Sequence, residues 1–242
     1  MDEADGKIVA LIADLDSPDK RKVRAAVDAL FLLATDSSEL YTRLAELLSD
    51  PQRQNCWPLA YILGSLPNPS PQTLDILLET LGSPDSDIRW AIALLLVRQA
   101  RTDSRVVDLL TQIVETGNAT QRRMTIYCIR DLCLEDAVAL PVLLKGLRDT
   151  EPLVRVASAT ALKARADLSP DGRSLLLKVF ANDPDFRVRS AAAITLAGLG
   201  EASEEFLTAL SQAIGTENPQ IKKAACAALA LLEKKRSAPS VR

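Results

Sequence analysis

A short motif that returns at a nearly constant interval limits the fold of this sequence more than any other feature. In each copy, a turn rich in Pro, Asp and Asn leads into a strongly apolar segment, and one residue at its start marks the repeat. These residues are Arg24, Trp57, Arg89, Arg123, Arg155, Arg189 and Lys222. The steps between them are 33, 32, 34, 32, 34 and 33 residues. Such a period predicts one supersecondary unit that is repeated and stacked.

Each unit also contains an earlier segment with helical periodicity, over residues 6–15, 39–48, 72–81, 105–115, 137–147, 173–180 and 204–214. No segment alternates with period two, so we expect no strands. A helical hairpin of this size buries its apolar faces only by stacking on its neighbours. The sequence therefore predicts an all-α protein, an α-solenoid with a right-handed superhelix of about seven helical hairpins.

The turns that join the two segments of each unit carry helix signals. In Ser83-Pro84-Asp85, for example, Pro stops one helix, and Asp can accept hydrogen bonds from the free N–H groups of the next. We assign residues 1–235 to a single solenoid. Residues 236–242 form a short, basic, Pro-containing tail that we expect to be disordered.

The repeat resembles the HEAT class, and more specifically the phycobilisome-lyase HEAT-like repeat. Units of that type have an Asp-rich turn, then Val-Arg, then an Ala-Ala pair and Leu-Gly. The run DPDFRVRSAAAITLAGLG, from Asp183 to Gly200, matches this pattern nearly completely, whereas the run Cys56-Trp57-Pro58 departs from it. The resemblance covers nearly the whole chain. It implies the fold and leaves the function open, because such repeats serve many roles.

The chain contains no histidine. This excludes Ser-His-Asp triads, Cys-His pairs and histidine-ligated metals. Among HEAT-like enzymes, the deoxyhypusine hydroxylases carry a di-iron site on His-Glu dipeptides, so that activity is excluded as well. We expect no catalytic residue, no metal site and no cofactor.

Charge and apolar patterning narrow the choice of partner. Lys and Arg total 29 against 32 Asp and Glu, a net charge of -3, which disfavours a nucleic-acid partner. The longest apolar runs, Trp90 to Val97 and Ala224 to Leu232, are well short of the ~20 residues that span a membrane. We expect no membrane partner and a cytosolic location. The four cysteines, Cys56, Cys128, Cys133 and Cys226, are expected to be reduced and mostly buried.

The cations that recur in the motif allow two interpretations. They are Arg24, Arg89, Arg123, Arg155, Arg189 and Lys222. In HEAT-like units such a cation pairs with the turn carboxylate of an adjacent unit, and the candidates here are Asp19, Asp50, Asp85 and Asp183. This structural ladder is the interpretation that we favour, because stacking requires one cation in every unit. The alternative is a basic stripe that binds an acidic ligand.

Aromatic residues gather on the second helices of units two to four. With Met124 they form a candidate partner-binding ridge, which consists of Trp57, Tyr61, Trp90, Met124 and Tyr127. These positions lie off the main core stripe of each helix. In a HEAT-like stack the second helices line the concave surface, and Trp, Tyr and Met are typical of protein-binding hot spots. The alternative is that these side chains only pack between neighbouring helices.

The sequence therefore predicts a non-catalytic scaffold or adaptor that binds a protein or peptide on the concave face of a HEAT-like solenoid. The resemblance to phycobilisome-lyase repeats implies an alternative, a bilin lyase subunit or pigment-handling chaperone. A third interpretation is an anion or nucleic-acid binder that uses the repeated cations. The sequence leaves the oligomeric state and the identity of the partner open.

Overall fold

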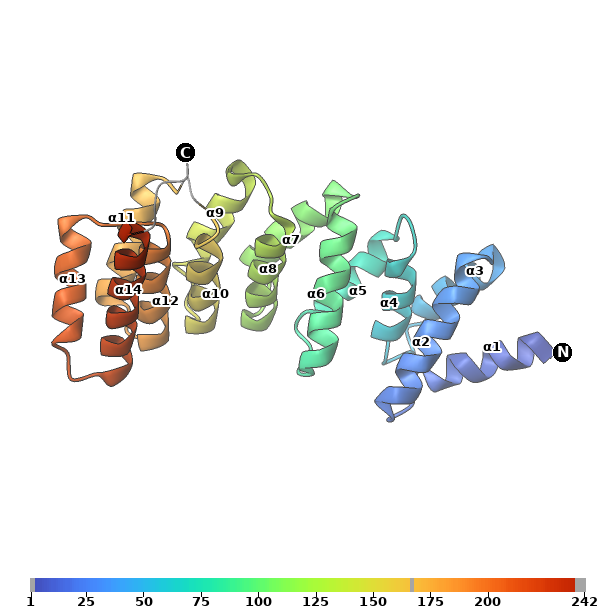
Figure 1. The fold of residues 1–242 in the computed structure, drawn as a ribbon. Coiled ribbons are helices and arrows are strands. Elements are labelled where there is room, and N and C mark those ends of the chain that lie inside the picture. Colours follow the sequence, from blue (N-terminus) through green and yellow to red (C-terminus); the bar gives the residue numbers. More distant parts are fainter. Residues whose placement is uncertain (1–2, 166–167, 238–242) are drawn as a thin grey trace. The chain divides into compact units, whose positions relative to one another are not determined.

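The computed structural model describes residues 3–165 and 168–237, and over these residues it contains helices and no strands (Figure 1). The helices, in chain order, are α1 (Glu3–Asp14), α2 (Lys20–Thr35), α3 (Ser38–Leu48), α4 (Trp57–Ser65), α5 (Pro71–Thr80), α6 (Ser86–Ala100), α7 (Ser104–Thr116), α8 (Ala119–Leu132), α9 (Asp136–Gly146), α10 (Pro152–Leu162), α11 (Pro170–Asn182), α12 (Phe186–Gly198), α13 (Glu204–Ile214) and α14 (Pro219–Ser237). The predicted all-α solenoid of helix pairs is confirmed.

The chain divides into two compact units, Met1–Ile113 (unit 1) and Val114–Arg242 (unit 2), and the division falls inside α7. Within each unit the odd-numbered helices are the first members of the pairs and the even-numbered helices are the second. The prediction of one continuous right-handed superhelix over residues 1–235 stays a prediction, and each unit is described by itself below.

Side-chain caps explain where most of the second helices begin. Asp85 accepts hydrogen bonds from the N–H groups of Asp87 and Ile88 at the start of α6. Asp185 caps α12 in the same way through the N–H of Arg187. Asn118 and Gln121 form a reciprocal capping box at the start of α8. The turn residues therefore set the register from which positions on each second helix can be counted.

In unit 1, α4 begins late because the connection before it is long. Arg53, in this connection, donates to Asp16 at 2.8 Å, and Asn55 donates to the Leu15 carbonyl at 3.0 Å. Cys56 occupies the N-cap position of α4 without a side-chain cap hydrogen bond, and Trp57 is the first residue of the helix. The second helices α2, α4 and α6 pack in sequence, α2 on α4 and α4 on α6.

In unit 2 the second helices α8, α10, α12 and α14 pack in sequence, and Figure 1 shows α10, α12 and α14 in succession. These helices bury small residues, including Ala159, Ala192 and Ala193. The buried hydroxyl of Thr195 donates to the Ala159 carbonyl at 2.8 Å and ties α12 to α10. First helices meet through larger side chains: the rings of Phe180 and Phe206 pack edge to face, with centroids 5.7 Å apart.

Two smaller expectations need correction. Helix α14 runs to Ser237, so residues 236 and 237, which were assigned to the tail, are helical, and residues 238–242 lie outside the described part of the chain. None of the four cysteines, all of which lie in the described residues, forms a disulfide, but Cys133 and Cys226 are exposed and Cys56 is half-buried, so only Cys128 follows the prediction of burial. In the described residues, no helix is both long enough and apolar enough to cross a membrane.

Candidate functional site: arginine contacts and an exposed second-helix surface

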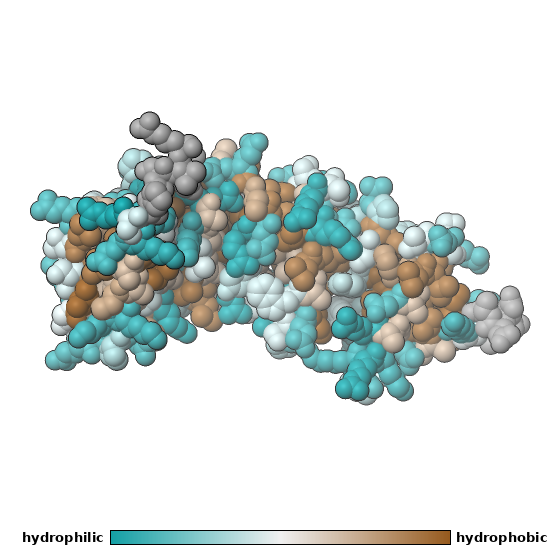
Figure 2. All heavy atoms as spheres, viewed as in Figure 1, coloured by the Kyte–Doolittle hydropathy of each residue, from teal (hydrophilic) through white to brown (hydrophobic). Residues whose placement is uncertain are grey.

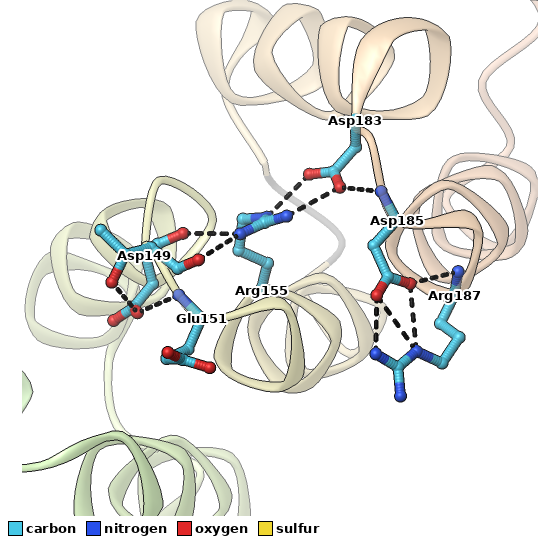
Figure 3. Close-up of polar contacts among 7 residues, drawn as sticks. Asp149, Glu151, Arg155, Asp183, Asp185 and Arg187 are labelled. Atoms are coloured by element: carbon cyan, nitrogen blue, oxygen red, sulfur yellow. Dashed lines mark hydrogen bonds and ion pairs between the residues drawn. The ribbon is translucent and has the colours of Figure 1, made fainter.

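Arg155, the fourth residue of α10, joins two turns of unit 2 (Figure 3). Its Nε and Nη2 donate to the two carboxylate oxygens of Asp183 at 2.7 and 2.8 Å, a bidentate pair. Its Nη1 donates to the carbonyl oxygens of Asp149 and Thr150 at 2.9 and 3.0 Å. The side chains of Arg155 and Asp183 are only 10% and 6% exposed. The contact therefore ties the turn before α10 to the turn after α11.

A hydrogen bond connects the carboxylate of Asp183 to the next acidic residue of the same turn, Asp185. Asp183 also accepts from the N–H of Asp185 at 2.9 Å. Asp185 in turn binds the Arg187 side chain at 2.6 Å while it caps α12 (Figure 3). The hydrogen bond from the Arg187 side chain, helped by backbone N–H groups, lowers the pKa of Asp185 to about 2. Asp185 therefore stays ionised at neutral pH.

Arg122 repeats this geometry one helical repeat earlier, still within unit 2, as the fourth residue of α8. Its Nε and Nη2 donate to Asp149 at 2.7 Å each, and its Nη1 donates to the Gly117 carbonyl at 2.8 Å. Burial raises the pKa of Asp149, but the hydrogen bonds from the Arg122 side chain and from the N–H of Glu151 outweigh this effect. The net result is a pKa below the ordinary value of 3.8.

The position that carries this contact is therefore the fourth residue of a second helix, and the assignment of Arg123 to the ladder is wrong by one residue. Steps of 33 residues join Arg89, Arg122 and Arg155, whereas the choice of Arg123 produced a step of 34 followed by one of 32. One residue along a helix is a rotation of about 100°. The Arg123 side chain accordingly points elsewhere, and its buried Nε has no hydrogen-bond partner.

The other repeated cations do not form a carboxylate pair in the described residues. Arg89 donates to the Ser83 carbonyl at 2.5 Å, and Arg189 donates to the Phe180 carbonyl at 2.8 Å. Arg24 and Lys222 are exposed and have no side-chain hydrogen bond or ion pair in residues 3–165 and 168–237. Of the four candidate carboxylates, only Asp183 receives a repeated cation.

The remaining three candidate carboxylates act elsewhere. Asp85 forms an ion pair with Lys20, whose Nζ lies 2.5 Å from the Asp85 Oδ2. Asp19 accepts from the N–H of Arg21 and caps α2. Asp50 accepts from the N–H of Gln52 within its own turn. The predicted ladder is thus reduced to two rungs, Arg122–Asp149 and Arg155–Asp183, both in unit 2.

In unit 1, side-chain contacts fix which residues of the second helices lie level with one another. Gln99 and Arg98 of α6 donate to the carbonyls of Gly64 and Ser65 of α4, at 2.5 and 3.5 Å. Lys20, the first residue of α2, reaches Asp85 at the N-cap of α6. Residues about 33 positions apart on neighbouring second helices are therefore level.

Each second helix of unit 1 exposes a stripe of residues four positions apart. We define the second-helix surface of unit 1 as these nine residues: Arg24, Asp28 and Leu32 on α2, Trp57, Tyr61 and Ser65 on α4, and Trp90, Leu94 and Arg98 on α6. Leu32 is 67% exposed, Leu94 64% and Trp90 42%. Trp57 and Tyr61 are half-buried. Figure 2 shows apolar atoms at the surface over α6 and α2.

The register places Trp57 level with Trp90, and Tyr61 level with Leu94. Three of the five predicted partner-binding residues therefore lie on one surface of unit 1. Sequence reasoning missed Leu94 and Leu32. The signal that could have found Leu94 is its spacing of four residues from Trp90, which puts both on one helical face.

The other two predicted partner-binding residues lie on α8 of unit 2 and differ from each other. Met124 is 1% exposed and belongs to the core, so its assignment to a binding ridge is wrong. The cause is the same slip of one residue that affected Arg123. Tyr127 is half-buried, and the guanidinium of Arg130 lies over its ring, 5.1 Å from the centroid.

No group of three or more His, Cys, Asp or Glu side chains that could hold a metal ion is found in the described residues. What the molecule offers chemically is therefore an apolar and aromatic surface in unit 1 and a set of structural ion pairs in unit 2.

Comparison with known proteins gives a family and a fold. A family model described as HEAT repeats matches residues 41–130, 107–197 and 174–242. The match does not confirm the phycobilisome-lyase type within that family. No curated protein matches the sequence closely enough to count as a relative.

Three solved structures are similar to the chain. The X-ray structure of YibA from Escherichia coli is 16% identical, with a TM-score of 0.56 over 97% of this chain and 98% of that one. Kap121p is 17% identical, with a TM-score of 0.57 over 96% of this chain and 27% of that one. Cex1p is 18% identical, with a TM-score of 0.56 over 98% of this chain and 55% of that one. At these identities the likeness shows the fold.

Proposed function

Because the chain belongs to the HEAT-repeat family, we propose that it is a non-catalytic, cytosolic adaptor that binds a protein or peptide through the second helices of its repeats. The observation that carries the proposal is the second-helix surface of unit 1, where Trp90 and Leu94 expose 42% and 64% of their area side by side on α6. HEAT-like stacks use such extended surfaces for binding.

Two features of this surface support the proposal. Burial of apolar area stabilises a complex by roughly 25 cal/mol per Å², so large exposed side chains are where a partner gains most. Trp and Tyr are also enriched among the residues that dominate binding energies. The alternative, that the aromatic side chains only pack between helices, fits half-buried Trp57 and Tyr61 better than it fits Trp90.

The test is affinity capture from the native cell followed by mass spectrometry, with three versions of the full chain. The Trp90→Ser/Leu94→Ser variant removes the apolar part of the α6 stripe. Leu207→Ser is the matched control, because Leu207 is also exposed but lies on α13, a first helix. We expect proteins that wild type and control both capture and that the double variant loses, with all three chains folded as judged by circular dichroism. An identical set from all three would overturn the proposal.

The alternative function, a bilin lyase subunit or pigment-handling chaperone, comes from the sequence resemblance. Coexpression of the chain with a bilin source tests it directly. Visible absorbance on the purified chain, or bilin transfer to an acceptor protein, would establish pigment handling in place of the adaptor role.

A further inference from the structure

We infer that the second-helix surface of unit 1 accepts a peptide segment in which acidic side chains flank large apolar ones. The inference rests on the proposed function and adds the chemistry of the partner. Two arginines occupy opposite corners of this surface, Arg24 on α2 and Arg98 on α6, with the aromatic and apolar side chains between them.

The two arginines are available to a partner. The Arg24 side chain is exposed and makes no hydrogen bond or ion pair within the described part of the chain. Within residues 3–165 and 168–237, the side chain of the exposed Arg98 has one hydrogen bond, to the Ser65 carbonyl at the long distance of 3.5 Å. Four other cations of unit 1 do have a carboxylate partner in the same unit: Lys20, Arg43, Arg53 and Arg105.

The charge of the surface selects the sign of the partner. Among the nine residues that define the surface, Asp28 is the one carboxylate, against two guanidinium groups. A basic segment would meet like charge at both corners, whereas an acidic one would gain two charge-assisted contacts beside an apolar surface. Asp28 lies one helical turn from Arg24, so it excludes a second acidic side chain from that part of α2.

The spacing of the corners predicts the spacing of the acidic residues. Packed helices lie about 8–10 Å apart, and eight residues of helix rise about 12 Å. The corners are therefore separated by two helix spacings and two helical turns, roughly 20 Å. An extended peptide covers that distance in about six or seven residues, at about 3.3 Å each. The side chains between the acids would then lie over Trp57, Tyr61, Trp90 and Leu94.

The first arm of the test is selection from a phage-displayed library of random 12-residue peptides on the immobilised full chain. A parallel selection uses the Trp90→Ser/Leu94→Ser variant. We expect wild type to enrich peptides with two acidic residues about six or seven positions apart and large apolar residues between them. We expect the double variant to lose these peptides.

The second arm is fluorescence anisotropy with one enriched peptide made synthetically. Arg24→Glu should weaken its binding at least tenfold, and added salt should weaken binding to wild type. Lys222→Glu is the matched control, since Lys222 is an exposed cation without a partner on α14 and should leave binding unchanged. The melting temperature of Arg24→Glu should stay close to that of wild type, because Arg24 has no side-chain hydrogen bond or ion pair to lose in the described residues.

The outcomes separate this inference from the proposed function. Enriched peptides that depend on Trp90 and Leu94 but are basic, or that bind Arg24→Glu as well as wild type, would overturn the inference and leave the adaptor function standing. Selection that enriches no peptide dependent on Trp90 and Leu94 would count against both.

Discussion

The fourth residue of a second helix has different roles in the two units of this molecule. In unit 2, Arg122 and Arg155 stand there and hold a carboxylate with two hydrogen bonds each, whereas Arg189 donates to the Phe180 carbonyl and Lys222 has no side-chain partner in the described residues. In unit 1 the same position holds buried Val23 on α2, buried Ala60 on α4, and Arg89, which donates to a carbonyl. The helix pair therefore recurs in every repeat, whereas the ion pair at the fourth residue of the second helix does not.

For Arg89, the absence of an ion pair follows from the residue that would receive the guanidinium. Arg122 and Arg155 bind carboxylates 27 and 28 residues further along the chain. The residues at those two distances from Arg89 are Thr116 and Gly117, neither of which is acidic. Unit 1 instead relies on side chains that donate to backbone carbonyls, such as Gln99 to Gly64. Unit 2 thus places two buried ion pairs at the fourth position of its second helices, whereas the ion pairs between turns of unit 1, Lys20–Asp85 and Arg53–Asp16, come from other positions.

The largest expected effect is the loss of a buried rung. Arg155→Met leaves the Asp183 carboxylate buried without its cation, which costs about 3 kcal/mol or more. This lowers the melting temperature by roughly 10 °C, as measured by differential scanning calorimetry. The comparison variant in unit 1 is Arg24→Met, at an exposed arginine with no ion pair in the described residues; it should shift the melting temperature by less than about 1 °C, since exposed unpaired charges contribute little. Equal shifts for the two variants would remove the distinction between the units.

A smaller effect tests the register of α8. Arg122→Lys keeps the charge but loses the planar fork that binds both oxygens of Asp149, so we expect a loss of about 1 kcal/mol in urea unfolding. Arg123→Lys, one residue along, breaks no ion pair in the described residues and should cost less. The reverse order would restore Arg123 to the ladder.

The pH dependence of stability should differ between wild type and Asp149→Asn. In wild type the folded state holds the pKa of Asp149 below 3.8, so this carboxylate contributes its stability above that value and loses it as the pH falls through the folded pKa. Urea midpoints measured from pH 6 to pH 3 should therefore fall less steeply for Asp149→Asn, although it is less stable at pH 6. Parallel curves would contradict the role assigned to Asp149.

The labelling of the Cys128 thiol gives the smallest effect and reports on unit 2. Burial raises the pKa of Cys128 on α8 to about 12, so this thiol should react with a disulfide reagent only when the unit opens. The exposed thiols of Cys133 and Cys226 should react at once. Arg155→Met should speed the labelling of Cys128, and Arg24→Met should not. Equal rates would mean that the rungs do not hold unit 2 closed.

The sequence predicted the helices well because their signals are local. Leu74 and Leu77 mark a buried face, and Asp85 and Asp185 mark helix starts, whatever the rest of the chain does. The candidate site was predicted only in part. A register error of one residue turns a side chain by about 100°. Such an error placed Met124 in the binding ridge, although its side chain is buried in the core. The observed steps of 32 to 34 residues between motif copies do not exclude an error of this size.

The ion pairs were harder still to predict, because each depends on a turn in the following helical repeat. Asp149 was not among the candidate carboxylates, although it pairs with Arg122, and Asp85 was a candidate but pairs with Lys20. The late start of α4 is likewise set by the anchoring of Arg53 on Asp16, a contact 37 residues away. Local patterns carry no information about such partners.

The carbonyl contacts at the ends of the second helices have a consequence for protein engineering. Gln99 caps the end of α4 from α6, and Arg165 binds both the Leu134 carbonyl and Asp136 beyond the end of α8. In each case a later repeat supplies a different donor to the end of an earlier one. The repeats are therefore not interchangeable modules: a repeat that is deleted or shuffled would leave a helix end facing a side chain that was selected for another neighbour.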